Sequence, residues 1–347
     1  AHASNPSGMT AIGDGIELAR EKLNTAPGSW DVKAMIVLTD GQETAGKYIS
    51  EVADEVIDNR VFAIGMGTAE QIQPSALDAL TSGTGGYLLM TGNIGADETF
   101  LLEKYYVQIL AGVNNNDIVV DPEGWARPGV VDRIPFDVIE SDVEITAMVL
   151  GRPANVLTIA LEAPDGQLVA IGNPSLTGRV TPRTIYMRAG LPLIAGGAAA
   201  HAGRWHLLLT FNRQYYGRDT INVAASAVNW PDTPAGGPSI HYSASVSAYS
   251  NLRMAAAIHQ SSLEPGATLT LEATLSEYGA PFLGYATVQV EMTRPDGTMV
   301  LVPLAPVSGE PGRFRASRTT VQAGIYRCHF LASGRTTREE PFTREAI

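Results

Sequence analysis

Two residues near the start of the chain have the chemistry of ligands for a hard metal ion. Thr10 lies in the segment SGMTAI (residues 7–12), and Asp40 lies in a Thr-Asp-Gly turn directly after a short apolar run. Hydroxyl and carboxylate oxygens are ligands that Mg²⁺ and Ca²⁺ prefer in proteins. The same residues also suit structural roles, since Thr is a common helix N-cap and Asp a common turn residue. The sequence alone therefore leaves two roles open. Thr10 and Asp40 either form a metal site, or serve only as a helix N-cap and a turn residue, respectively.

The elements that would position these residues alternate between helix and strand. Because strands separated by helices indicate βαβ units, we expect a parallel sheet with right-handed crossovers. Ligands of such sheets bind outside the carboxyl ends of the strands, which is where Asp40 lies. The patterns predict helices over residues 11–23, 49–59, 75–80 and 98–110, and buried strands over residues 34–38, 61–64 and 87–90.

Residues 7–16 (SGMTAIGDGI), 36–43 (IVLTDGQE) and 84–86 (TGG) together resemble the second half of a von Willebrand factor A-type (vWA) domain. In that family a metal-ion-dependent adhesion site is built from an Asp-x-Ser-x-Ser loop, a Thr before a helix and an Asp in a Thr-Asp-Gly turn. Thr10 and Asp40 match the second and third loops. No Asp-x-Ser-x-Ser occurs in the chain. The resemblance thus implies a Mg²⁺ or Ca²⁺ site that is incomplete in this chain.

The hydrophobic pattern changes after about Gly112, where short alternating or β-branched runs separated by turns replace the helices. Regular strand and turn spacing of this kind is typical of antiparallel sandwiches. We therefore predict a multidomain fold, α/β plus all-β: a partial, doubly wound vWA-like parallel sheet followed by two antiparallel β-sandwich-like modules. The predicted boundaries are a vWA-like domain at 1–112, a β-rich module at 113–229, a linker at 230–238 and an immunoglobulin/fibronectin-like sandwich at 239–347.

The composition of the chain excludes several classes of partner and site. The formal net charge of −12 disfavours nucleic acid and anionic membrane surfaces, which require basic faces. No apolar stretch approaches the roughly 18 residues of a membrane span. A single cysteine, Cys328, excludes an internal disulfide.

Other candidate residues fit no catalytic pattern. His201 and His206 lack the third ligand of a zinc site. Cys328 and His329 are adjacent on a predicted strand and would point to opposite faces, so they cannot form a nucleophile pair. Glu339 and its neighbour Glu340 lie in a charged segment expected to be solvated. The sequence contains neither a Gly-x-Ser-x-Gly elbow nor a His-Glu-x-x-His motif.

These features favour a binding or adhesion protein over an enzyme, with a protein ligand contacted through the vWA portion. The alternatives are a non-catalytic C-terminal fragment of a larger secreted enzyme or channel regulator, and a hydrolase with no recognisable motif. The β modules resemble those of secreted vWA proteins related to calcium-activated chloride channel regulators, which implies a secreted, periplasmic or cell-surface location. The resemblance also implies that residues 34–38 form the fourth strand of six and an exposed edge, with residues 35–38 unprotected. We expect the upstream half of the domain, or a second copy of the chain, to cover it.

Overall fold

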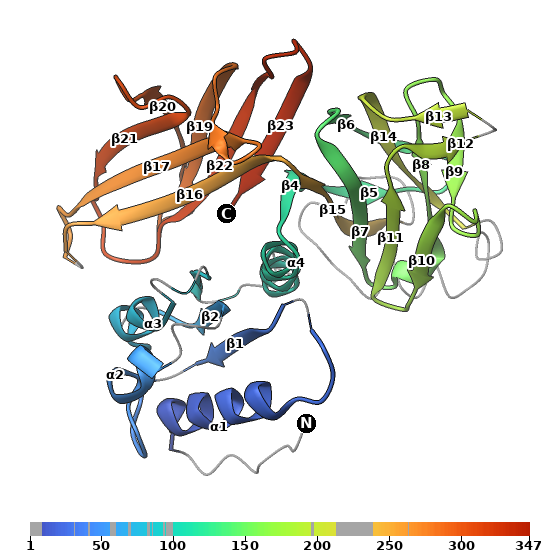
Figure 1. Ribbon diagram of the computed structural model, residues 1–347. Coiled ribbons are helices and arrows are strands. Elements are labelled where there is room, and N and C mark those ends of the chain that lie inside the picture. Colours follow the sequence, from blue (N-terminus) through green and yellow to red (C-terminus); the bar gives the residue numbers. More distant parts are fainter. Residues whose placement is uncertain are drawn as a thin grey trace. The chain divides into compact units, whose positions relative to one another are not determined.

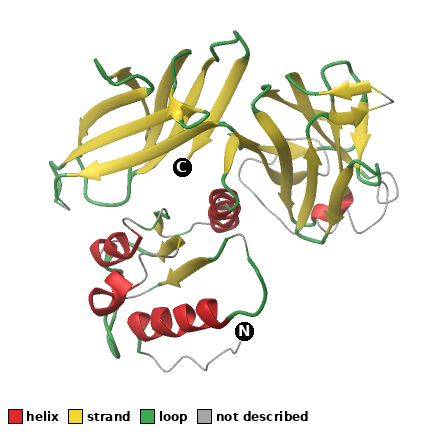
Figure 2. Cartoon of the chain, viewed as in Figure 1, coloured by secondary structure: helices red, strands yellow, loops and turns green. Residues whose placement is uncertain are grey.

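The computed structural model of the protein describes residues 9–30, 32–40, 42–55, 60–68, 71–81, 84, 86–92, 94, 100–195, 198–212, 239–262 and 264–347 (Figure 1). The chain divides into two compact units. The first contains residues up to Asn114 together with Ala323–Tyr326, and the second contains the rest. Figure 2 shows that the long helices belong to the first unit and that strands dominate the second.

The first unit is an α/β domain with a three-stranded parallel sheet in the order β1-β2-β3. Each helix and strand predicted from the hydrophobic pattern is present, with ends that differ by a few residues. The helix predicted over 49–59 is shorter, since α2 gives way to a 3-10 turn and residues 56–59 lie outside the described part. The elements are α1 (Ile12–Thr25), β1 (Ala34–Thr39), α2 (Ile49–Val52), η1 (Ala53–Glu55), β2 (Arg60–Met66), α3 (Pro74–Thr81), β3 (Leu88–Gly92) and α4 (Leu101–Val113).

Helices cover both faces of this sheet over β2. On one face, Met35 and Val61 belong to a buried core built with side chains of α1, α2 and α3. Successive side chains of a strand point to opposite faces, so Phe62 faces the other way. Its ring meets that of Tyr87 edge-on, with 5.0 Å between the centroids. A Cβ on Gly112 of α4 would lie 3.6 Å from both rings, which places α4 against this second face.

β1 is an edge of the sheet, because β2 is its only partner among the described strands. The prediction that residues 35–38 are all unprotected is wrong for Met35, which is only 5% exposed because α1 and α2 cover its face. Ile36 and Leu38 point to the opposite face and are each 43% exposed. The unprotected surface of β1 is therefore one face and one edge.

The first module of the second unit is a sandwich of two antiparallel sheets. One sheet has the order β10-β11-β7-β15-β4, with β5 also paired to β15, and the other has the order β6-β14-β8-β9. Trp205 is fully buried between them in a large apolar core. The strands are β4 (Asn116–Val120), β5 (Glu123–Ala126), β6 (Asp132–Val138), β7 (Asp142–Gly151), β8 (Leu157–Glu162), β9 (Leu168–Ala170), β10 (Leu176–Val180), β11 (Thr184–Gly190), β12 (Leu193–Ala195), β13 (Ala198–Ala200), β14 (Gly203–Phe211) and β15 (Ile240–Ser250).

The second module continues the hydrogen bonding of the first. β23 pairs with β4 through Glu345 and Ile118, so the two modules share one continuous run of paired strands. Along that run the strands of the second module follow the order β23-β22-β19-β20-β21-β17-β16. They are β16 (Leu252–Gln260), β17 (Thr268–Glu277), β18 (Ala280–Pro281), β19 (Tyr285–Thr293), β20 (Met299–Pro306), β21 (Arg313–Thr319), β22 (Arg327–Arg335) and β23 (Pro341–Ala346).

The change from one module to the other falls at Asn251, between β15 and β16. β15 pairs with β7, β4 and β5 of the first module, whereas β16 pairs with β17 of the second. The predicted start of the second module at residue 239 is therefore wrong, since residues 240–250 belong to the first. Residues 230–238, predicted to be a linker, lie outside the described residues.

The predicted fold class is confirmed: an α/β start is followed by β-rich modules. Within the described residues from 128 to 341 the only helical turn is a short 3-10 segment, η2 (Ala154–Val156). None of the helices that the structure describes is long and apolar enough to cross a membrane.

Candidate functional site

The loop before α1 and the loop after β1 are hydrogen-bonded to each other at one edge of the sheet. The backbone N–H of Thr10 donates to Oγ1 of Thr44 at 2.8 Å, and the N–H of Thr44 donates to the carbonyl of Thr10 at 2.9 Å. Thr44 follows Asp40 closely in the loop that leaves the carboxyl end of β1. The segment before α1 and the loop after Asp40 are thus joined by hydrogen bonds between the main chain of Thr10 and both the main chain and the hydroxyl of Thr44.

A second set of contacts fixes the first turn of α1 against the same loop. The N–H of Gly13 donates to the carbonyl of Lys47 at 3.1 Å, and the N–H of Lys47 donates to Oδ1 of Asp14 at 3.2 Å. Glycine is required at two positions here. A Cβ at Gly13 would lie 2.3 Å from the Lys47 carbonyl oxygen, and Gly46 has φ +71° and no room beside the Asp14 carboxylate. Residues 10–14 and 44–47 therefore form one packed unit, which we call the paired loops.

Thr10 and Asp40 both lie at this edge. Asp40 is exposed immediately after β1, and Thr10 is partly exposed immediately before α1. The structural role considered for Thr10 is wrong by one residue, because the N-cap of α1 is Ala11 and no side chain caps this helix. The main chain of Thr10 is instead hydrogen-bonded to Thr44. Thr10 therefore lies beside the loop that follows Asp40.

Glu43 adds a carboxylate that the sequence analysis did not single out. Its Oε1 accepts a hydrogen bond from the N–H of Ile49 at 2.7 Å. Burial raises the pKa of Glu43 above its ordinary value, although the backbone N–H groups of Ile49 and Gly13 favour its charged form. This carboxylate is already engaged by backbone donors, so it supports the loop and the start of α2.

The oxygen donors of Thr10 and Asp40 fit a hard divalent cation in kind but not in number. Ca²⁺ takes about 6–8 oxygens and Mg²⁺ about six, several of them water. Within the described part of the chain, no group of three or more His, Cys, Asp or Glu side chains is arranged to hold a metal ion. A cation at this edge would depend on groups beyond Thr10 and Asp40.

Cys328 and His329, which the sequence analysis also considered, have different surroundings. Cys328 is buried with 4% exposure, and burial raises its pKa to about 12, which keeps the thiol protonated and unreactive. His329 points to the opposite face of β22, where Nε2 lies 3.0 Å from Glu345 and Nδ1 lies 3.4 Å from Glu291. The prediction that Cys328 and His329 do not meet is confirmed by their opposite burial.

The two histidines of the 201–206 segment have separate surroundings. His201 Nε2 lies 2.8 Å from the carbonyl oxygen of Asp142, and its own carbonyl accepts a hydrogen bond from Trp205 Nε1 at 2.7 Å. Burial and the neighbouring Arg133 lower the pKa of His206, against the opposing charge of Glu162. Both histidines therefore make contacts within the first β module, and among the described residues they do not share a site.

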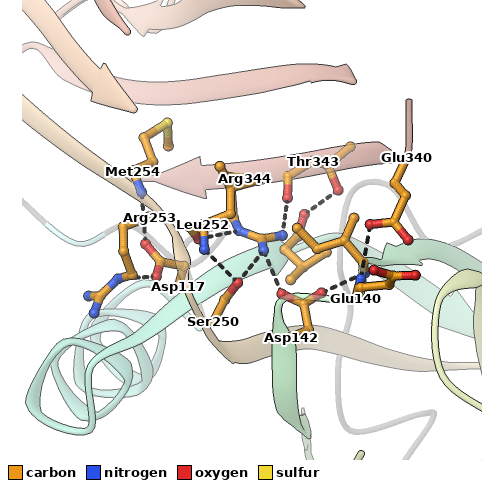
Figure 3. Close-up of polar contacts among 12 residues, drawn as sticks. Asp117, Glu140, Asp142, Ser250, Leu252, Arg253, Met254, Glu340, Thr343 and Arg344 are labelled. Carbon is orange, nitrogen blue, oxygen red and sulfur yellow. Dashed lines mark hydrogen bonds and ion pairs between the residues drawn. The ribbon is translucent and has the colours of Figure 1, made fainter. Parts of the chain in front are cut away.

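The strongest polar cluster of the second unit was missed by the sequence analysis. Arg344 and Asp142 are both fully buried, and Nη2 of Arg344 lies 2.7 Å from Oδ1 of Asp142 (Figure 3). Arg344 also donates to Ser250 Oγ at 3.0 Å and to the carbonyl of Leu252 at 3.2 Å. These partners lie in β7, β15 and β16, and Arg344 itself lies in β23, so one guanidinium ties together strands of both β modules. The available signal was a charged residue at an inward position of an alternating strand.

An ion pair and a backbone-to-carboxylate hydrogen bond flank this cluster. We call the cluster and these two contacts together the junction network. Arg253 Nε lies 2.5 Å from Asp117, whose other oxygen accepts the N–H of Met254 at 3.0 Å. Glu340, expected to be solvated, is partly buried and accepts the N–H of Glu140 at 3.0 Å, whereas its neighbour Glu339 is exposed. Figure 3 shows these groups converging on the crossing between the modules.

Comparison with known proteins bears on the first unit. The von Willebrand factor type A domain family model matches residues 2–97. No curated protein matches the chain. Among solved structures, the chain is similar to a DUF4785 family protein from Legionella pneumophila (10% identity, TM-score 0.37, 66% of this chain and 63% of that one). It is also similar to a von Willebrand factor type A protein from Catenulispora acidiphila (14% identity, TM-score 0.26, 77% and 45%).

The chain therefore spans less than two thirds of either solved structure. The family match covers the α/β part alone and includes both Thr10 and Asp40. The match to residues 2–97 supports a von Willebrand factor type A domain in the N-terminal part of this chain.

Proposed function

We propose that the protein is a binding or adhesion protein whose vWA domain contacts a protein partner through a divalent cation, Mg²⁺ or Ca²⁺, at the carboxyl end of β1. The observation that carries the proposal is the pairing of Thr10 with Thr44, which joins the segments before α1 and after β1 at one edge. Thr10 and Asp40 would contribute a hydroxyl and a carboxylate oxygen to the ion.

The proposal includes an incomplete coordination shell. Two side chains with one negative charge bind a hydrated cation weakly, so affinity on the order of millimolar is expected for the chain alone. Mg²⁺ keeps several waters when protein ligands are few. An acidic side chain of the partner can replace one of these waters and complete the shell, which makes metal and partner binding mutually dependent.

Calorimetric titration of the whole chain with Mg²⁺, Mn²⁺ and Ca²⁺ tests the site. We expect weak binding that is lost in Asp40→Asn and kept in Asp165→Asn, which removes a charge from an exposed turn of the first β module. Binding that persists unchanged in Asp40→Asn would overturn the proposal. Tight binding that Asp40→Asn abolishes would support the site but contradict its incompleteness.

The exposed edge of β1 supports a second contact of this domain. Unpaired backbone groups on an edge strand favour pairing with another strand, and Ile36 and Leu38 leave apolar surface beside it. We propose that a strand from the upstream half of the vWA domain covers this edge, with a second copy of the chain as the alternative occupant. Intact-mass analysis together with sedimentation distinguishes a bound fragment, a dimer and a bare 36.8 kDa monomer, and the monomer would overturn both versions.

The wider setting follows as part of the same proposal. We propose a secreted, periplasmic or cell-surface location, with the β modules acting as a spacer or as further contact surface. The proposed relationship is to secreted vWA proteins of the kind related to calcium-activated chloride channel regulators. Cell fractionation with an antibody against the chain tests the location, and recovery in the cytoplasm alone would contradict it.

A further inference from the structure

β16 is an open sheet edge without the usual protection. It closes the strand order of the second module and pairs only with β17 among the described strands. Residues 255–260 are exposed on both faces of the strand. The core-facing side is also open, because Ile258 lies opposite the buried Leu271 and yet is 46% exposed. The core of the second module therefore does not extend over residues 255–260 of β16.

Other sheet edges of the same unit carry the features that prevent strand pairing. β6 contains Arg133 and Pro135, β10 contains Gly178 and Arg179, and β9 has only three residues. Charge, proline and short length all discourage a further strand. In β16 the residues after Arg253 read Met-Ala-Ala-Ala-Ile-His-Gln, seven residues with no carboxylate, lysine, arginine, proline or glycine.

We infer that β16 is a self-association surface, on which a second copy of the chain adds its own β16 in antiparallel pairing. An antiparallel edge is complementary to its own copy, because each unpaired N–H meets a carbonyl of the partner under two-fold symmetry. The neutrality of residues 254–260 matters in a chain of net charge −12, since this pairing sets no like charges against each other across the strands.

The side chains select one register. With the two-fold axis at Ala257, every residue of 254–260 has a partner, and Ile258 lies opposite Ala256 of the copy. Met254, Ala256 and Ile258 from both copies then continue the core face of the sheet, and Gln260 lies opposite Met254 at each end of the row. Shifting the axis to Ala256 would instead place Arg253 opposite His259. A pair of strands buries less than the roughly 1,200–2,000 Å² of a standard interface, so the dimer is expected to be weak and concentration-dependent.

Sedimentation velocity of the full chain over a concentration series tests the inference. We expect the average mass to rise toward a dimer with concentration, and Ala257→Lys to return the chain to a monomer because two lysines would face each other. Leu283→Lys is the matched control, since it adds the same charge at a residue that is 74% exposed elsewhere in the module. A monomer at all concentrations, or a dimer that Ala257→Lys leaves unchanged, would overturn the inference; the second result would direct attention to β1.

Cross-linking tests the register separately. In a Cys328→Ser background, Ala257→Cys is expected to form a disulfide-linked dimer on mild oxidation, because residue 257 faces itself across the axis. Ala255→Cys is the control, since the two cysteines would be about 13 Å apart along the strands. Equal cross-linking of the two variants would contradict the pairing described here.

Discussion

Arg344 and Asp142 form a fully buried ion pair between residues 202 positions apart, with Nη2 and Oδ1 separated by 2.7 Å. The pair joins β23 of the second module to β7 of the first. The remaining oxygen of Asp142 accepts the N–H of Ile139 at 2.9 Å, and the guanidinium has four acceptors in all. Both charges are therefore matched by hydrogen bonds despite the loss of water.

Removing one member of the pair should be costly. Arg344→Met leaves the Asp142 carboxylate buried without its counter-charge, and we expect the free energy of unfolding to fall by about 3–5 kcal/mol. Urea denaturation followed by circular dichroism measures this. The double variant Arg344→Met with Asp142→Leu should recover a large part of the loss, because it leaves no unpaired charge. Arg133→Met, which removes an exposed ion pair with Glu162, should leave the free energy of unfolding nearly unchanged, because water and salt screen exposed pairs.

His329 should make stability depend on pH. Burial opposes its charged form, but the hydrogen bond and charge of Glu345 and the charges of Glu291 and Asp121 outweigh it and raise its pKa. A raised folded pKa means that the stabilisation is complete below the unfolded value of about 6.5 and is lost as pH rises through the folded pKa. His329→Gln should therefore lower stability at pH 5.5 more than at pH 8.5.

Titration of the histidine ring signals by NMR provides the control. His329 should titrate above free histidine and His206 below it, since burial and Arg133 lower the pKa of His206. If the two rings titrate together, the geometry around His329 does not control its charge. Equal losses of stability at both pH values in His329→Gln would lead to the same conclusion.

Two glycines of α1 give a matched test of the paired loops. Gly13→Ala would place a methyl group against the Lys47 carbonyl and disrupt the contact between α1 and the loop after β1. Gly15→Ala meets nothing within 4 Å and should stabilise the helix by up to about 1 kcal/mol. We expect a lower midpoint of urea unfolding for Gly13→Ala and an equal or higher one for Gly15→Ala. Similar midpoints for the two variants would show that the loops are not packed as described.

Cys328 should be inert in the folded protein. Since burial raises its pKa to about 12, the thiolate is almost absent at neutral pH. Ellman's reagent is expected to react slowly with the native chain and rapidly in denaturant, with one thiol released per chain. Fast reaction without denaturant would mean that β22 opens readily to solvent.

The sequence was most informative where structure is local. Helical and strand periods identified the four α-helices and three strands that the structure describes in the first unit, because each pattern is complete within a few residues. The alternation around Cys328 also predicted correctly that its thiol and the His329 ring lie on opposite faces.

Long-range pairing was not accessible in the same way. Arg344 was not singled out, since its counter-charge Asp142 lies far away in the chain. The hydrogen bond from the N–H of Thr44 to the carbonyl of Thr10 uses main-chain atoms alone, so it leaves no trace in residue type either. The stretch rich in Pro and Gly before residue 239 drew the module boundary to itself, although pairing of β15 with β7 places the crossing at Asn251.

Because the chain passes from one β module to the other at Asn251, a cut in the gene before residue 239 does not separate the two modules cleanly. A gene fragment that ends at residue 238 encodes a sandwich without β15, the strand between β7 and β4 in the middle of its sheet. A fragment that begins at residue 239 carries this strand away from its neighbours and exposes a row of buried side chains. Recombination at the obvious Pro/Gly-rich position would therefore give two incomplete proteins, and exchange of these modules among genes requires that both travel together.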